Sequence, residues 1–519
     1  MGMEMSDADA LRILHRNTIP DNVRRAAAKY RTRPALTFAG RVWSFAELDR
    51  AAGRIAHRLA GLGLARGDRV GVYARNSDAY LLLWLGCIRI GLVHVPINYA
   101  LTVSELRYIL DQSGARALFY DPDLLATVDS ARRDAKVEHY GLVRDGAGDI
   151  LSTALDQNAP RIDEALCADE DAAQFCYTSG TTAAPKAAVM THRAYMAEYL
   201  ACAIELEFSG ADVALAALPL YHTAQMHAFT MPQMLVGAIT HLIESPAPDV
   251  VLELIERLRI TSFFAPPTVW IGLLRHPDFK TRDLTTLRNI YYGASIMPVP
   301  VLHELRAALP GVRVYNCYGQ TEIAPLATLL KPEEHDARPA SAGRPILSVE
   351  TRVVDADMRD VAPGVHGEIV HRSPQLLNEY WNKPDETKEA FAGGWFHSGD
   401  VGYFDEEGYL FVVDRVKDII KSGGVVVAGR EVEEALFRHP SVSEVAVVGL
   451  PDPKWIEAVT AIVVLKPGFE PDEAGLLAHA RELLAPFKTP KRVIYAPSLP
   501  RNTAGKLLKR ELRAQYAKS

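Results

Sequence analysis

The chain has 519 residues, of which 48% are hydrophobic and 23% are charged, and its formal net charge is −7. This length exceeds what one hydrophobic core serves, so we expect two or more domains. A negative charge without blocks of like residues disfavours a nucleic-acid partner, because phosphate backbones require a concentrated basic face. The five scattered cysteines disfavour a disulfide framework or a zinc site and favour a reducing cytoplasm.

Two segments bear on membranes and export. The first residues include Glu4, Asp7 and Asp9 in place of a basic region, so we expect no signal peptide. Residues 79–97 are almost wholly apolar, but Arg89 lies inside the run and a turn ends it. The pattern predicts a buried helix to about residue 90 followed by a strand. We therefore expect a cytoplasmic protein without an integral membrane segment.

Helical and strand patterns alternate over the first four-fifths of the chain. Ser44 is a candidate cap for a helix with apolar residues at helical spacing up to Leu62. Further helices are expected at 104–113, 123–135, 193–206 and 250–259. Strands are expected at 69–73, 117–120, 172–176, 187–190, 213–218, 262–265, 287–292 and 314–316. Such alternation predicts an α/β fold with a parallel or mixed sheet covered by helices.

The texture changes at about residue 344. Short strands with turn signals are expected at 349–354, 367–372, 394–400 and 408–413, which indicates a small β subdomain. A charged break follows at 414–418. The tail then has helices at 430–437 and 472–484 and strands at 442–448 and 458–465. The sequence thus predicts an N-terminal domain at 1–413, with its β subdomain at about 344–413, and a small α+β C-terminal domain at 418–519.

Residues 177–186 combine hydroxyl side chains with a glycine and a lysine. The stretch lies between two apolar runs that read as strands, so its hydroxyls and N–H groups are free to turn toward an anion. Pro185 directly precedes Lys186, which distinguishes the stretch from the P-loop of GTPases. On its own, the stretch fits either a phosphate-binding loop or a polar surface hairpin.

Two other stretches follow predicted strands. Residues 219–227 are rich in aromatic and histidine side chains and come after a strand, where open α/β sheets place ligands. The spacing of His222 and His227 does not indicate a metal site. The strand at 287–292 runs into Gly293, Ala294 and Ser295 without the turn motif of a hydrolase serine.

Taken together, these stretches resemble the AMP-forming acyl-CoA synthetase family, adenylating enzymes that also include luciferases and the adenylation domains of peptide synthetases. The resemblance covers nearly the whole chain. Its motifs occur in the family's order at residues 177–186, 219–222, 318–322, 394–400, 414–424 and 500–506. The resemblance implies that a carboxylate attacks the α-phosphorus of ATP to give an acyl-adenylate and pyrophosphate, and that the thiol of CoA then displaces AMP. ATP, CoA and Mg²⁺ are therefore the expected substrates and cofactor.

The resemblance also implies roles for individual residues. Thr321 would contact the α-phosphate and Glu322 would hold Mg²⁺. The adenine walls would include Tyr318, while Asp400 and Arg415 would bind the ribose. The residues expected at the β- and γ-phosphates are Thr178, Ser179, Gly180, Thr181, Thr182 and Lys186. The other residues expected at the base are Gly293, Ala294, Ser295, Gly319 and Gln320.

Further residues match the family's acyl-transfer parts. His222 would lie between the acyl pocket and the adenylate. Lys506, on a loop of the C-terminal domain, would bring the carboxylate and the α-phosphate together as the catalytic lysine. The C-terminal domain would be mobile about a hinge at 414–417, with Lys417 at its pivot. The segment expected to meet the pantetheine arm of CoA contains Lys421, Gly423 and Gly424.

The chain departs from the common family pattern in several places. Ala183 and Ala187 stand where glycine is usual, which predicts a stiffer phosphate loop. Val426 and Ile456 are unusual residues on the side expected to face CoA. The leading hypothesis is an acid:CoA ligase for a fatty or otherwise apolar or aromatic acid. The resemblance is also compatible with a homodimer. Three alternatives stay open: a carrier-protein thiol or amine as acceptor, nitrite activation as in ATP-dependent diazotases, and a non-catalytic nucleotide-binding relative.

Overall fold

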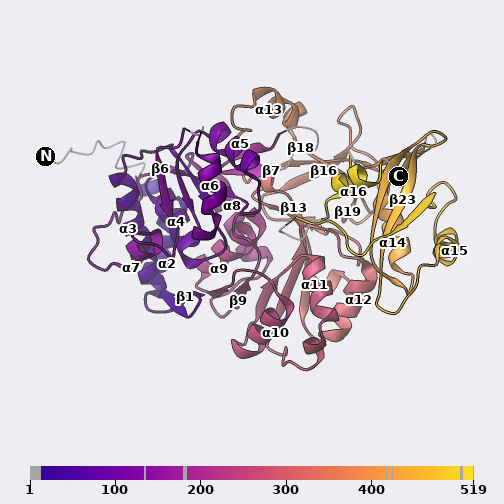
Figure 1. Cartoon of the computed structure of the whole chain (residues 1–519), viewed down its shortest axis with the longest axis horizontal. Helices are drawn as coiled ribbons and strands as arrows, with labels where there is room; N and C mark the ends of the chain where they lie inside the picture. Colours follow the sequence, from indigo (N-terminus) through magenta and orange to yellow (C-terminus); the bar gives the residue numbers. More distant parts are fainter. Residues whose placement is uncertain are drawn as a thin grey trace.

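A computed structural model describes residues 13–133, 136–178, 184–416, 418–422, 425–502 and 507–517. The elements are arranged as sheets covered by helices, with the strands of the C-terminal part at the opposite end of the molecule from the N-terminal helices (Figure 1). The predicted α/β class, with a large N-terminal sheet region and a smaller C-terminal one, is confirmed. The exact domain boundaries and the hinge at 414–417 stay predictions.

The largest sheet carries most of the candidate site. Its strands lie in the order β15-β14-β13-β12-β11-β9-β10-β1-β2, and β13, β12, β11, β9, β10 and β1 run parallel. The carboxyl ends of parallel strands meet at one edge of a sheet, where ligands bind in open α/β folds. The strands are β1 (Pro34–Phe38), β2 (Arg41–Ser44), β9 (Val213–Ala216), β10 (Ile239–Leu242), β11 (Ser262–Phe264), β12 (Asn289–Gly293), β13 (Arg313–Gly319), β14 (Leu326–Leu330) and β15 (Arg344–Pro345).

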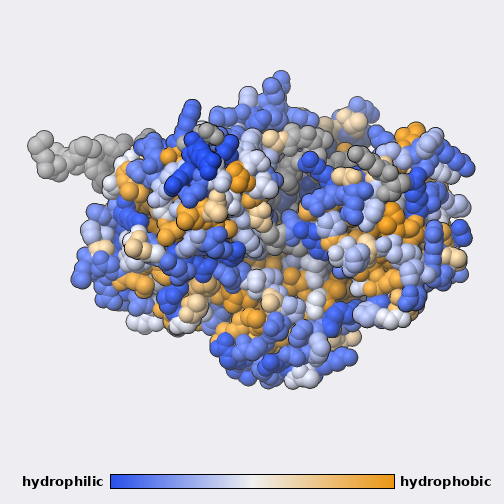
Figure 2. Space-filling view, in the orientation of Figure 1, coloured by the Kyte–Doolittle hydropathy of each residue, from blue (hydrophilic) through white to orange (hydrophobic). Residues whose placement is uncertain are grey.

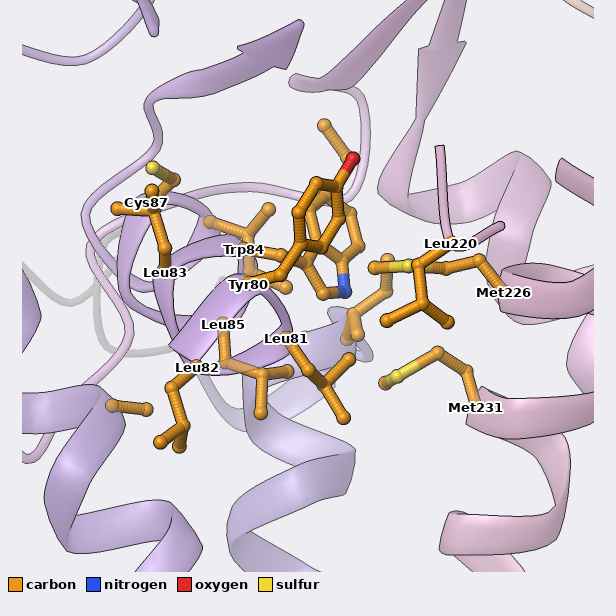
Figure 3. Packing of buried hydrophobic residues seen from close by; sticks show 14 of the residues in the cluster. Tyr80, Leu81, Leu82, Leu83, Trp84, Leu85, Cys87, Leu220, Met226 and Met231 are labelled. Carbon is orange, nitrogen blue, oxygen red and sulfur yellow. The ribbon is translucent and has the colours of Figure 1, made fainter. Parts of the chain in front are cut away.

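A second sheet, in the order β6-β5-β3-β4-β7-β8, ends in an antiparallel pair. Its strands are β3 (Arg69–Tyr73), β4 (Val93–Ile97), β5 (Ala115–Tyr120), β6 (His139–Leu142), β7 (Ala172–Thr178) and β8 (Lys186–Thr191). The apolar run 79–97 forms the buried helix α4 (Asp78–Arg89) and then β4, as predicted. Figure 3 shows α4 side chains packed toward Leu220, Met226 and Met231. Among the described residues, no helix is long and apolar enough to cross a membrane.

The helices cover these sheets. Ser44 and Glu47 form the capping box that starts α3, with the backbone N–H of Ser44 donating to Glu47 Oε2 at 2.9 Å. The helix expected at 123–135 is shorter, because Pro122 opens a 3₁₀ turn before α6 (Leu125–Ala131). The remaining N-terminal helices are α2 (Ile19–Tyr30), α3 (Phe45–Gly61), α5 (Val103–Ser113), α7 (Ile150–Leu155), α8 (His192–Glu205), α9 (Met231–Val236), α10 (Pro248–Arg257), α11 (Pro267–Arg275), α12 (Val299–Ala308) and α13 (Pro384–Ala390).

The short strands after residue 344 form a separate antiparallel sheet, as expected. It consists of β16 (Glu350–Val354), β17 (Gly367–Arg372), β18 (Phe396–Phe404) and β19 (Leu410–Arg415). β18 begins two residues later than predicted because Gly393 and Gly394 have φ of 63° and 75°, which forms a turn that a strand cannot include.

The C-terminal part has its own sheet. β22 (Val442–Asp452) and β23 (Ile456–Leu465) are antiparallel, and α15 (Glu473–Leu483) leads to β24 (Arg492–Tyr495), which runs parallel to β23. β20 (Ile420–Ser422) and β21 (Val425–Val427) complete the sheet. Helices α14 (Gly429–Phe437) and α16 (Lys509–Tyr516) pack on β22.

Candidate active site

The large sheet brings several predicted residues to one edge. β12 ends in Gly293, and β13, its parallel neighbour, ends in Gly319 with Tyr318 beside it. Gly293 pairs with Cys317, and a Cβ at position 293 would lie 2.4 Å from the Cys317 carbonyl oxygen. The sheet therefore accepts only glycine there. Ala294 follows with a left-handed φ of 62°, which turns the chain away from the sheet at the expected adenine wall.

Asp400 is held by two partners from different elements. Its Oδ1 is 2.9 Å from Nε of Arg415, its register partner on β19, and its Oδ2 accepts a hydrogen bond from the Tyr318 hydroxyl at 2.7 Å. Asp400 is 4% exposed. Burial and the Asp400 charge hold the pKa of Tyr318 well above its usual value. The structure thus brings together three of the residues predicted to bind the nucleoside, around one carboxylate that can accept from paired hydroxyl groups.

Thr321 and Glu322 lie in a 3₁₀ turn directly after β13. The Glu322 side chain is 9% exposed, and its Oε1 accepts a hydrogen bond from the Tyr380 hydroxyl at 3.1 Å. The Oγ1 atoms of Thr321 and Thr223 are 3.4 Å apart, which joins this turn to the segment after β9. Together with the nucleoside-side residues Tyr318, Asp400 and Arg415, Thr321 and Glu322 define what we call the nucleotide region.

The buried side chains of Glu198 and Gln375 hydrogen-bond to the backbone that follows Glu322. Glu198 on α8 is fully buried, and its Oε1 accepts from the backbone N–H of Leu326 at 3.0 Å while its Oε2 accepts from Gln375. Gln375 also donates to the carbonyl oxygens of Ile323 and Leu326, at 3.3 and 3.0 Å. Burial raises the pKa of Glu198 to about 8. These bonds fix the backbone that follows Glu322.

The phosphate loop is anchored in the second sheet, as expected. β7 and β8 are antiparallel, and Thr178 and Lys186 are register partners at the two ends of the loop. Nζ of Lys186 lies 4.6 Å from the centroid of the Tyr380 ring. The other predicted phosphate-binding residues lie outside the described residues: Ser179, Gly180, Thr181 and Thr182.

The expectation that Ala187 stiffens this loop is wrong. Ala187 is fully buried inside β8, pairs with Tyr177, and accepts a hydrogen bond from the backbone N–H of Trp381 at 2.9 Å. Any residue adopts the extended backbone of a strand, so an alanine here removes no freedom from the loop. Ala183 lies outside the described residues.

The two histidines after β9 separate. His222 is half-buried, with its ring centroid 4.6 Å from that of Tyr221. A π-helical turn, Ala224–Thr230, then carries His227 into the core, where its Nδ1 is 2.6 Å from the Tyr199 hydroxyl and its Nε2 is 2.9 Å from Gln174 Oε1. Only His222 therefore stays at the edge that carries the nucleotide region. No pattern of residues at 219–227 indicated the π-helical turn.

The acceptor region consists of β20, β21 and the first residue of β23. The exposed residue Lys421 donates its backbone N–H to Glu457 Oε2 at 2.6 Å and pairs with Val426. Ile456 pairs with Ser422, is 68% exposed, and has a left-handed φ of 67°, which is strained for a β-branched residue. The unusual isoleucine at position 456 therefore places a strained backbone at the start of β23.

Several predicted residues of the C-terminal side lie outside the described residues: Lys417, Gly423, Gly424 and Lys506. The loop that carries Lys506 is closed at its base by an isolated antiparallel bridge between Arg501 and Leu507. The backbone N–H of Leu508 also donates to the carbonyl of Pro500 at 2.9 Å. Both ends of this loop are therefore fixed to the C-terminal part.

Tyr380 was not among the residues predicted from the sequence. This residue touches both Lys186 and Glu322, although it is distant from each in the sequence. The available signal was the aromatic pair Tyr380 and Trp381 just before a charged helix, and nothing in its spacing pointed to ATP. Gln320, in contrast, was predicted, and in the described part of the chain its buried Nε2 has no hydrogen-bond partner.

Comparison with known proteins agrees with this geometry. Residues 23–381 match the family model of AMP-binding enzymes, and residues 431–506 match the model of their C-terminal domain. A feruloyl-CoA synthase of Amycolatopsis sp. is 36% identical over 482 residues, covering 93% of this chain and 96% of the relative. A long-chain-fatty-acid–CoA ligase of Mycobacterium tuberculosis is 35% identical over 477 residues, covering 91% and 93%.

A solved structure is similar over nearly its whole length. The crystal structure of the anthranilate CoA ligase AuaEII in complex with anthranoyl-AMP superposes with a TM-score of 0.90 at 27% identity, and the match covers 96% of this chain and 97% of that one. Fold, motif order and full-length similarity agree. The chain belongs to the AMP-forming acyl-CoA synthetase family of AMP-binding enzymes.

Proposed function

We propose that the protein is an ATP-dependent acid:CoA ligase that forms AMP. The observation that carries the proposal is the convergence of Tyr318, Glu322, Asp400 and Arg415 with Lys186, in a chain similar to CoA ligases over more than nine-tenths of its length. In the first half-reaction, a carboxylate oxygen of the acid attacks the α-phosphorus of ATP and the bond to pyrophosphate breaks. In the second, the CoA sulfur attacks the acyl carbon and AMP leaves.

The nucleotide region supplies the recognition that these steps require. Asp400 would exchange the hydrogen bond from the Tyr318 hydroxyl for bonds from the ribose hydroxyls, while Arg415 keeps the carboxylate oriented. The Tyr318 ring and residues 293–295 would enclose the base, a flat surface suited to stacking. Thr321 would donate to the α-phosphate. These groups are fixed before ATP arrives, so little reorganisation is needed when charge develops on the phosphoryl oxygens.

The phosphate loop and Lys186 would hold the β- and γ-phosphates. The Lys186 ammonium carries a fixed positive charge at the end of the hairpin, and that charge would favour departure of pyrophosphate. Lys506 would approach from the C-terminal part and lower the repulsion between the acid carboxylate and the α-phosphate. His222 would separate the acyl pocket from the adenylate.

The residues present fit Mg²⁺. A carboxylate oxygen is the ligand that Mg²⁺ prefers, and Glu322 offers its carboxylate beside the expected phosphates. The described residues contain no group of three or more His, Cys, Asp and Glu that could hold a metal alone. This agrees with an ion held by one carboxylate together with ATP oxygens. When bound, Mg²⁺ would neutralise phosphate charge.

The acid is expected to have an apolar body. The segments expected near the acyl group, residues 221–229, 292–295 and 315–321, contain no Lys or Arg, so no cation there would pair with a second carboxylate. Tyr221 is nearly buried and meets Tyr99 edge to face at 5.8 Å. Relatives named for ferulate and for long-chain fatty acids indicate aromatic and aliphatic acids as the first candidates.

The proposal is tested by incubating the protein with ATP, Mg²⁺ and a panel of aromatic and fatty acids, with and without CoA. Pyrophosphate release, AMP and the thioester are measured together. We expect acid-dependent pyrophosphate release and one thioester per AMP when CoA is present. Pyrophosphate release that leads to no thioester would indicate a different acceptor. ATP turnover that ignores every acid would contradict the proposal.

A further inference from the structure

One short segment connects the turn that carries Glu322 with the strand that begins at Lys186. In residues 375–381, the backbone N–H of Leu377 donates to the Glu322 carbonyl at 2.8 Å, and that of Asn378 donates to the Val189 carbonyl at 2.9 Å. An isolated bridge pairs Tyr380 with Ala188. The segment is therefore hydrogen-bonded both to the turn that carries Glu322 and to the strand that begins with Lys186.

The Tyr380 side chain contacts the functional groups of both elements. Its hydroxyl donates to Glu322 Oε1 at 3.1 Å, and the Lys186 ammonium lies over its ring, 4.6 Å from the centroid. Tyr380 is 6% exposed. The anion thus binds the polar edge of the ring and the cation binds its electron-rich face, which is the electrostatically favourable arrangement for each.

This arrangement keeps opposite charges apart. In the described part of the chain, no ion pair joins Lys186 to Glu322. A lysine and a glutamate so close to a shared ring would attract each other, and a direct pair would use the carboxylate that Mg²⁺ needs and the ammonium that phosphate needs. A tyrosine that binds both leaves each group available to its own ligand.

We propose that Tyr380 is a positioning residue for adenylation that holds Glu322 and Lys186 separate and oriented toward the metal ion and the phosphates of ATP. This inference rests on the proposed function and deepens it. The two contacts are separable by mutation. Tyr380→Phe removes the hydrogen bond to Glu322 and keeps the ring under Lys186, whereas Tyr380→Leu removes both.

The chain supplies a matched control. Tyr409 is also 6% exposed, its hydroxyl donates to Glu334 Oε1 at 2.8 Å, and Arg338 lies 4.1 Å from its ring centroid. This second arrangement of cation, ring and carboxylate belongs to the β subdomain and its neighbouring loop, outside the nucleotide region. Tyr409→Phe therefore reports what the loss of such a hydroxyl does to structure alone.

The test measures ATP binding by calorimetry over a range of Mg²⁺ concentrations, together with melting temperature and pyrophosphate release. We expect Tyr380→Phe to raise the half-saturating Mg²⁺ concentration roughly fivefold, the equivalent of one hydrogen bond, with a KM for ATP at saturating Mg²⁺ within about twofold of wild type. Tyr380→Leu should raise both values. Tyr409→Phe should change neither.

An unchanged Mg²⁺ dependence in Tyr380→Phe, or a shift equal to that of Tyr409→Phe, would overturn the inference. A lowered kcat with unchanged Mg²⁺ and ATP dependence would also overturn it, because a purely structural role would have that effect. The calorimetric comparison is independent of the acid. A wild-type protein that binds ATP with Mg²⁺ but releases no pyrophosphate would contradict the proposed function alone, and the role of Tyr380 would still be decided.

Discussion

In the nucleotide region, Asp400 is 4% exposed and bound by both Tyr318 and Arg415, whereas in the acceptor region Ile456 is 68% exposed and has a left-handed backbone. The first region is assembled from the buried carboxylates Asp400 and Glu322 and from half-buried side chains on different sheets. The second consists of short strands of the C-terminal part, a part of the molecule whose face in Figure 2 mixes hydrophilic and hydrophobic residues. We infer that recognition of ATP would be built into the first region, whereas the approach of the second substrate would depend on placement of the C-terminal part.

The strongest way to break this contrast is Asp400→Ala. The change leaves Tyr318 and Arg415 without their shared partner and removes the expected ribose contact, so kcat/KM for ATP should fall about 100-fold. The measurement is ATP-dependent pyrophosphate release at varied ATP. Asp405→Ala is the control, because Asp405 accepts from Arg338 at 2.7 Å in the same part of the molecule, away from the nucleotide region. Equal losses in both variants would argue against a ribose role.

A lower pH should destabilise the N-terminal part of the molecule more than the C-terminal part. Burial lowers the pKa of His94 to about 3 and lowers the pKa values of His192, His335 and His371 to about 4. Because the unfolded chain binds these protons near pH 6.5, the stabilisation is complete above that pH and is lost as the pH falls toward the folded pKa values. Each such histidine should lower the free energy of unfolding by about 2 kcal/mol between pH 6.5 and pH 5.

Calorimetry with hydrogen exchange at pH 7 and pH 5 tests this. The N-terminal part, which contains these four histidines, should open first in acid. Replacing His371, whose ring lies 6.4 Å from that of Tyr318, by Phe should remove about 2 kcal/mol of the acid loss, whatever its effect at pH 7. The exposed His57, replaced by Asn, should leave the acid loss unchanged. An acid dependence that is the same in His371→Phe and wild type would refute the assignment.

The smallest expected effect is on stability and concerns the strained residue Ile456 of the acceptor region. Ile456→Gly should relieve the strained φ of 67° and raise the free energy of unfolding by about 1 kcal/mol. Val425→Gly, at a 42% exposed position in the neighbouring strand β21, should instead lower it, because an extended backbone gains nothing from glycine. Urea unfolding of both variants measures this. A loss of stability in Ile456→Gly would mean that the strain is compensated by packing.

Much of the nucleotide region could be predicted from the sequence because its residues belong to contiguous motifs. Tyr318 lies near the end of β13 and Glu322 follows that strand. Asp400 and Arg415 were assigned from separate motifs that the antiparallel register of β18 and β19 brings together. The bond between Tyr318 and Asp400 could not be foreseen, since it joins different sheets. Motif order predicts which residues meet ATP, but not which of them hold one another.

Two outcomes depend on strand pairing. Ala187 was counted with the loop because of the family resemblance, although the strand pattern at 187–190 already included it, and the ladder between β7 and β8 begins at Lys186. Tyr380 was missed because its importance arises from pairing of residues 375–381 with a strand almost two hundred residues earlier. Single-sequence patterns report local conformation, whereas the contacts of Tyr380 depend on long-range strand pairing.

In the proposed mechanism, the nucleotide region needs Lys506 of the C-terminal part for adenylation and not for thioester formation. The most direct measurement compares the two half-reactions of Lys506→Ala: pyrophosphate release from ATP and acid, and thioester formation from a supplied acyl-adenylate and CoA. Arg510→Ala, an exposed position on α16, is the control and should resemble wild type in both. We expect Lys506→Ala to lose most adenylation and to retain thioester formation. Equal loss of both half-reactions in Lys506→Ala would contradict the proposed mechanism.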